Sequence, residues 1–119
     1  MASTSVGIFN TQLPQFNGKN YDYWAITMKA VFASHDLWEL VEYGFEEPVN
    51  EEEFIGLTQA EKELLKSNKK KDSKALVFLC QAVHESVFPR IAAAKTSREA
   101  WQTLKTAYQG MEKVKTAKL

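Results

Sequence analysis

The residues that could do chemistry are few and widely spaced. The two histidines, His35 and His84, stand in no recognisable arrangement with a carboxylate and a nucleophile. Cys80 lies in the apolar stretch LVFLCQAV, where a thiol more often packs as a small hydrophobic side chain than reacts as a thiolate. The sequence also lacks the glycine-rich phosphate-binding motifs and the nucleophile elbow. These features predict a protein that is not an enzyme.

The carboxylates gather in the segment EEPVNEEEF, residues 46–54. A run of like charges around a proline is typical of a solvated loop, whereas an acid/base pair needs a pocket that separates two pKa values. A single cysteine forms no internal disulfide, and no Cys/His spacing suggests a metal site. We expect no cofactor and no metal.

Cysteine usage and the lack of targeting signals bear on localisation. The N-terminus has no basic start followed by an apolar run, and no stretch reaches the roughly 18 apolar residues of a membrane span. A lone cysteine fits a reducing compartment. We expect a cytoplasmic protein, with the nucleus as the alternative, and no membrane partner.

Net charge predicts no general attraction to nucleic acid, because 15 basic and 15 acidic side chains cancel. The basic run KSNKKKDSK could still contact phosphates locally, and Lys69, Lys70 and Lys71 are the candidates for weak nucleic-acid contacts. The run contains no arginine and no aromatic residue for base stacking. A solvated helix face is the competing interpretation.

Apolar spacings of three and four residues predict an all-α fold, a compact bundle of about five helices with an extended N-terminal arm. A first helix should follow Asn20, and a short one should run from the cap Asp36 to Gly44. Thr58 begins a capping box for a long helix, in which the polar middle predicts a kink or break near Asn68. Pro89 should interrupt helix, and a second capping box at Thr96 and Glu99 should start a last helix that stops at Gly110.

The stretch PQFNGKNYDYWAITMKAVF, residues 14–32, combines a turn with dense aromatic residues. Most of these residues share one helix face, so core packing explains them. The alternative is a groove between the helix faces that Leu13, Phe16 or an extended segment of another protein can fill. The candidate groove residues are Leu13, Phe16, Tyr21, Tyr23, Trp24 and Met28. The expected core residues are Phe16, Tyr21, Trp24, Met28, Trp38, Leu76, Leu79, Trp101, Leu104 and Tyr108.

Several of these segments together resemble a known family. The segments are FNGKNYDYWAITMKAVF, LWELVEYGFEEP, AKTSREAWQTLKTAYQG and EKVKTAKL, and the resemblance covers nearly the whole chain, residues 13–119. This sequence resembles the Gag region of plant copia-type LTR retrotransposons. The most specific parts are Phe16, Gly18 and Tyr21 before Trp24, and the EAWQTLKTAYQG segment.

The resemblance implies the N-terminal lobe of a capsid protein, related to retroviral capsid N-terminal domains. We then expect a flexible tail at 1–12, the helical lobe at 13–110, and at 111–119 the start of a helix that leads to a C-terminal capsid lobe outside this chain. The implied function is self-association into virus-like particles that enclose element RNA, with RNA bound mainly through regions outside this chain. The alternative is a domesticated Gag-derived module that binds a peptide segment of another protein in an aromatic groove.

Overall fold

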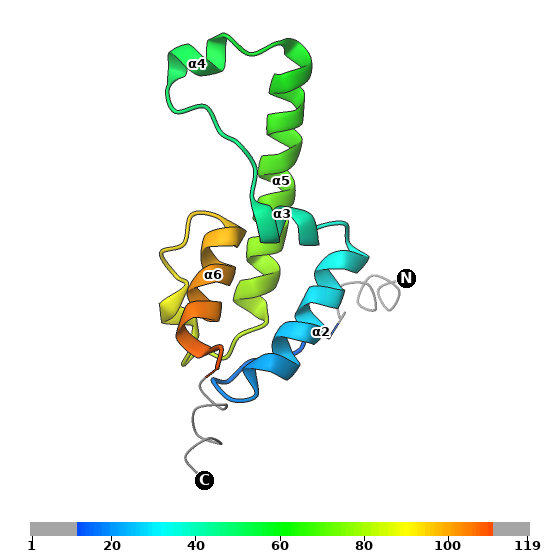
Figure 1. Ribbon diagram of the computed structural model, residues 1–119, viewed down its shortest axis with the longest axis vertical. Coiled ribbons are helices and arrows are strands. Elements are labelled where there is room, and N and C mark those ends of the chain that lie inside the picture. The colour runs from blue at the N-terminus through cyan, green and yellow to red at the C-terminus, as the bar shows by residue number, and fades with distance from the viewer. Residues whose placement is uncertain (1–11, 111–119) are drawn as a thin grey trace, which may run out of the picture.

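The chain folds into helices joined by loops (Figure 1), and the computed structural model describes residues 12–110. In chain order the elements are α2 (Tyr21–Ser34), α3 (Trp38–Tyr43), α4 (Glu51–Ile55), α5 (Gln59–Gln81), the 3-10 helix η1 (Phe88–Arg90) and α6 (Ser97–Tyr108). No strand occurs in residues 12–110, so the predicted all-α fold of about five helices is confirmed. The predicted helix start at 111–119 lies outside the described residues, as does the predicted tail except for Gln12.

Side-chain caps fix the starts of the two best predicted helices. At α5 the Thr58 hydroxyl accepts from the Glu61 N–H at 3.1 Å, and the Glu61 carboxylate accepts from the Thr58 N–H at 2.8 Å. At α6 the Thr96 hydroxyl accepts from the Glu99 N–H at 3.1 Å. Each bond satisfies an N–H group that has no partner within the helix.

The starts of the other helices differ from the prediction. Asp36 does not cap α3, because it adopts a left-handed φ of 59° and Leu37 takes the N-cap position without a side-chain cap bond. Asn20 does hold the N-cap position of α2, but α2 has no side-chain cap hydrogen bond. The predicted loop at 46–54 contains the one-turn helix α4, capped by the Asn50 side chain, which accepts from the Glu53 N–H at 2.8 Å.

The predicted break near Asn68 does not occur, since α5 is one continuous helix of 23 residues. Polar side chains in a helix weaken it when they bond to their own backbone. Here Ser67 and Ser73 are exposed, and the carboxylate of Asp72 is buried and bonds to α6 instead. The polar middle of α5 therefore reflects partners elsewhere in the fold and not a helix end.

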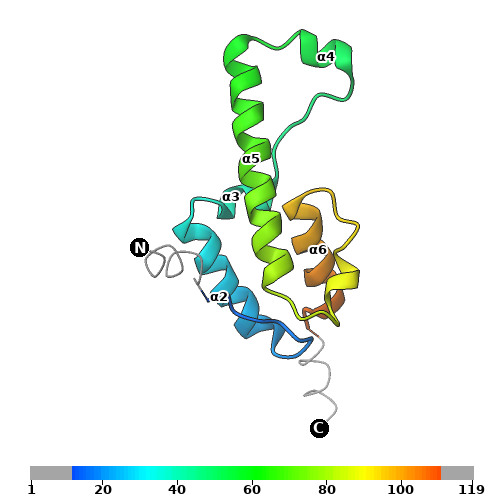
Figure 2. The same ribbon diagram turned by 180° about the vertical axis from the view of Figure 1, so that it is seen from behind.

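Two parts of the molecule are distinct in shape. Figures 1 and 2 show α2 and α6 on either side of the C-terminal half of α5, with α3 near the middle of α5. The N-terminal half of α5 extends beyond this body and carries α4 and the preceding loop with it. We call residues 45–70 the projecting arm.

Aromatic rings fill the core of the body. The rings of Trp24 and Trp101 stack with centroids 5.6 Å apart, Phe16 packs on Trp24 at 5.1 Å, and Phe32 meets Trp101 edge-on at 6.0 Å. Trp38 also meets Trp101 edge-on, at 5.3 Å. Of the ten predicted core residues, seven are buried, whereas Trp38, Leu76 and Tyr108 are half-buried and pack against the others.

We predict that Trp101→Ala lowers the free energy of unfolding by about 3–5 kcal/mol, because it removes a buried ring that contacts three other aromatic residues. Urea unfolding followed by circular dichroism measures the change. Tyr23→Ala is the matched control, since Tyr23 is 72% exposed and its loss should change the free energy by no more than about 0.5 kcal/mol. Equal midpoints for wild type and Trp101→Ala would contradict the role of this ring.

Candidate interaction surfaces

The segment before α2 is attached to the end of α5 by backbone hydrogen bonds. The Phe16 N–H donates to the Ala82 carbonyl at 2.8 Å, and the His84 N–H donates to the Phe16 carbonyl at 2.8 Å. The Gln15 side chain adds a bond to the Gln81 carbonyl at 2.7 Å. This pairing places the Phe16 ring in the core, so the segment is a fixed part of the body.

The turn between this segment and α2 depends on its small and polar residues. The Trp24 indole N–H donates to the Pro14 carbonyl at 3.0 Å, which satisfies the polar end of a buried ring. Gly18 has a φ of 99°, a conformation that favours glycine, and lies beside the ring of Tyr108. The chain can therefore reverse direction close to α6.

The structure distributes the six candidate groove residues between the core and the surface. Phe16, Tyr21, Trp24 and Met28 are buried in the core, and Leu13 is half-buried against it. Tyr23 is exposed on another face of α2. The segment that precedes α2 thus covers the side of α2 on which the alternative hypothesis expected a peptide of another protein.

A shallow groove of about 330 Å³ lies instead between α2, α3 and α6. Trp38 and Trp101 contribute aromatic surface to it, and the exposed Ile26 lies on its α2 side. The Lys29 ammonium stands 5.0 Å from the centre of the Trp38 ring. Of the six candidates only Tyr21 lines this groove.

Tyr21 connects the core to this groove. Burial, with a smaller contribution from the negative charge of Asp22, raises the pKa of Tyr21 to about 12. The side chain therefore stays neutral over the whole physiological pH range. It presents a phenol and not a phenolate to any partner in the groove.

A buried carboxylate joins α5 to the start of α6. One oxygen of Asp72 accepts from the Ser97 N–H at 2.9 Å and from the Ser97 hydroxyl at 2.6 Å. Both residues are buried, and Ser97 is the first residue of α6, where N–H groups lack helical partners and the helix dipole is positive. Asp72 thus caps a helix that is 25 residues away in the sequence, a role that its local sequence does not reveal.

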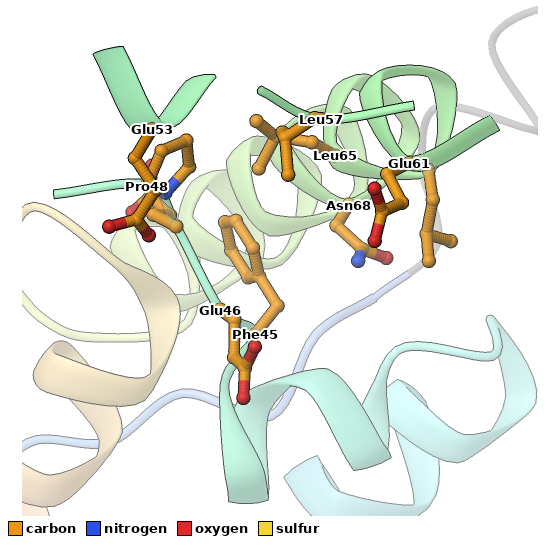
Figure 3. Close-up of a pocket in the computed structure, with 10 residues that line it drawn as sticks. Phe45, Glu46, Pro48, Glu53, Leu57, Glu61, Leu65 and Asn68 are labelled. Carbon is orange, nitrogen blue, oxygen red and sulfur yellow. The ribbon is translucent and has the colours of Figure 1, made fainter. Parts of the chain in front are cut away.

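The projecting arm encloses a hollow with four glutamates in its lining. Its loop and α5 line a pocket of about 390 Å³, with Phe45, Leu57 and Leu65 as apolar walls (Figure 3). Glu46 and Glu53 stand at the edge among the labelled side chains of Figure 3. The pocket is open, apolar within and negatively charged at its rim.

The three candidate nucleic-acid lysines do not form one surface. Consecutive residues on a helix point about 100° apart, so Lys69, Lys70 and Lys71 face different directions. Lys69 lies 3.8 Å from the carboxylate of Glu47 on the arm, and Lys71 lines a small hollow with Asp36. Nucleic-acid contact through this run stays a prediction.

The groups first considered for chemistry have ordinary surroundings. Burial raises the pKa of the Cys80 thiol, so the reactive thiolate is less populated than at a free cysteine. His35 packs edge-on against Phe78 at 5.0 Å, and His84 contacts the Ser86 hydroxyl at 2.9 Å. Among residues 12–110 no cluster of three or more His, Cys, Asp or Glu side chains could hold a metal ion. None of the described helices is long and apolar enough to span a membrane.

Comparison with known protein families shows to which family this chain belongs. The model of the gag-polypeptide of LTR copia-type matches residues 28–119. The chain belongs to this family. No curated protein and no solved structure matches this copia-type Gag chain. The family supports a structural, non-enzymatic Gag function, and the expected resemblance to a copia-type Gag region is confirmed.

The family match starts inside α2 of this Gag chain. It contains α3, α5, α6 and the projecting arm, but not Phe16, Tyr21 or Trp24. The resemblance was expected to extend from residue 13, so residues 13–27 lie beyond the matched region. The packing of Phe16 and Trp24 nevertheless places them in the same core as the matched helices.

We predict that Asp72→Ala destabilises this Gag chain by about 1–3 kcal/mol, because it leaves the buried N–H and hydroxyl of Ser97 without their acceptor. Ser97→Ala should cost less, about 1 kcal/mol, because it removes only the hydroxyl bond and Asp72 still accepts from the backbone N–H of residue 97. The double variant should cost less than the sum of the two single changes, which a double-mutant cycle in urea measures. Ser73→Ala, next to Asp72 but exposed, is the control and should be nearly neutral. Additive effects would show that the two side chains do not act together.

Proposed function

We propose that this chain is the N-terminal capsid lobe of a plant copia-type retrotransposon, and that it self-associates into virus-like particles that enclose element RNA. The observation that carries the proposal is the family match over residues 28–119. RNA is held mainly by regions of Gag outside this chain, because the three candidate lysines Lys69, Lys70 and Lys71 face different directions on α5. The particles form in the cytoplasm, with the nucleus as the alternative site.

The architecture suits a capsid subunit. A shell is built from many copies that make the same modest contact, so each subunit needs a fixed shape more than one strong site. The stacked aromatic core and the bond from Asp72 to Ser97 supply such rigidity. Exposed apolar side chains on the projecting arm, such as Ile55 and Leu64, supply surface for weak contacts.

The first test is sedimentation velocity of the purified chain over a wide concentration range, at low and high salt. We expect species larger than the monomer that grow with concentration. In cells, the Gag polypeptide that carries this lobe should yield particles by electron microscopy, with RNA that survives nuclease treatment. Particles that form equally well when residues 13–110 are deleted would refute a structural role for the lobe.

The groove between α2, α3 and α6 favours a second candidate function, a Gag-derived module that binds a peptide. Its aromatic floor and the lysine over Trp38 suit an extended apolar segment with a carboxylate. We expect Ile26→Ala to weaken binding of hits from a tiled peptide array by about fivefold or more. Tyr23→Ala, on another face of α2, should leave binding unchanged. No saturable binding to any peptide would exclude this function.

A further inference from the structure

The projecting arm is poorly covered by the rest of the chain. The first buried residue of α5 is Leu65, and no residue of α4 is buried. Helical segments of this length are marginal in water without tertiary packing. Four large apolar side chains of the arm are exposed, a concentration that is typical of protein interfaces. They are Val49, Phe54, Ile55 and Leu64.

The arm carries opposite charges on two different sides. Leu65, Asp72 and Leu79 mark the buried face of α5, and the helical repeat places Lys66 and Lys70 on the opposite, outer face. The same outer face continues to Lys74 and to the exposed Val77. It is therefore a basic strip with an apolar residue at one end.

The acidic side is the loop with α4. Five glutamates occupy it, and all five are exposed. They are Glu46, Glu47, Glu51, Glu52 and Glu53. The loop packs along the side of α5 that carries Leu64, Leu65 and Asn68, which line the pocket of about 390 Å³ with it. Phe54 of α4 reaches the N-terminal end of the basic strip, where it lines a second hollow with Lys66. Lys70, Lys74 and Val77 line neither hollow and stay open to a partner. Glu47 pairs with Lys69, whereas Glu51 and Glu52 belong to the first turn of α4, away from that pocket lining.

We propose that the projecting arm joins one copy of this chain to the next, with the acidic loop and α4 of one copy against the basic strip of α5 on its neighbour. This inference rests on the proposed self-association and names the surface that performs it. A second copy is the fitting partner because the chain carries both halves of the charge pattern, and because its net charge of zero avoids repulsion between copies. Ile55 on one side and Val77 on the other add apolar area within a charged rim, the usual composition of an interface.

The position of the two halves determines the type of assembly. In a two-fold dimer the loop of each copy meets the strip of the other at the same time, whereas in a head-to-tail contact only one loop and one strip pair between two copies. Head-to-tail contacts leave one free half at each end of the pair, so a third copy can add. The proposed shell needs such repeated addition, so we assign the arm contact to the head-to-tail type, which generates rings or open chains and does not stop at a dimer.

The test reverses each charge pattern separately. We expect Glu51→Lys with Glu52→Lys, and separately Lys66→Glu with Lys70→Glu, to weaken self-association of the full chain by about tenfold or more in sedimentation velocity. An equimolar mixture of the two variants should regain it, because the reversed loop of one now meets the reversed strip of the other. Regained association also shows that both variants are folded. High salt should weaken every one of these contacts.

Glu39→Lys with Glu85→Lys is the matched control for the variant with Glu51→Lys and Glu52→Lys, since it makes the same change in net charge with exposed residues outside the arm. It should associate like wild type. If both arm variants associate like wild type, the arm contact is wrong while self-association itself stands. A wild-type chain that stays monomeric, or that stops at a dimer, overturns the head-to-tail contact. The particle experiment on the Gag polypeptide still decides the proposed function in those cases.

Discussion

The stacking of Trp24 on Trp101 is the contact on which the body of this molecule depends. It joins the first helix to the last, and Phe16 on one side and Phe32 and Trp38 on the other enclose the pair. Aromatic rings of this size bury large areas with few rotatable bonds, so a small domain obtains both stability and a fixed geometry from them. The polar end of Trp24 is satisfied by the Pro14 carbonyl, which couples the ring stack to the path of the N-terminal segment.

A second constraint acts on α5, which is shared by the body and the arm. Asp72 bonds to Ser97 at the point where the buried face of α5 begins to pack on α6. A charged group is costly to bury unless it is hydrogen-bonded, so this bond fixes the register between the two helices. The N-terminal half of α5 then extends from a well-anchored base, which is why a lightly packed arm can have a defined direction.

Much of the fold could be predicted from the sequence because its signals are local. The capping box at Thr58, the single cap bond from the Glu99 N–H to the Thr96 hydroxyl, the stop at Gly44 and the periodic aromatic residues all depend on neighbours within a few positions. The wrong prediction of a break in α5 has a different cause. Judged from its neighbours in the sequence alone, Asp72 favours a break in the helix. Its hydrogen bond to the distant Ser97 makes it a stabilising residue of α5 instead.

The interaction surfaces were less predictable for the same reason. The aromatic residues 16–28 suggested a groove, but whether such residues face solvent depends on the segment that covers them, here the backbone pairing of Phe16 with the end of α5. The charged segments 46–53 and 66–74 each indicated a solvated surface. That Lys66, Lys70 and Lys74 share one outer face follows from the continuity of α5, which its polar middle argued against.

The family match starts at residue 28, but the core also contains Phe16, and this difference matters for the choice of a recombinant fragment. A recombinant fragment trimmed to the recognisable Gag boundary would lack the rings of Phe16, Tyr21 and Trp24 and would leave one side of Trp101 open to water. Such a fragment would expose its own core and precipitate or bind indiscriminately. The physical folding unit of this protein therefore includes residues on the N-terminal side of the portion that the family model recognises.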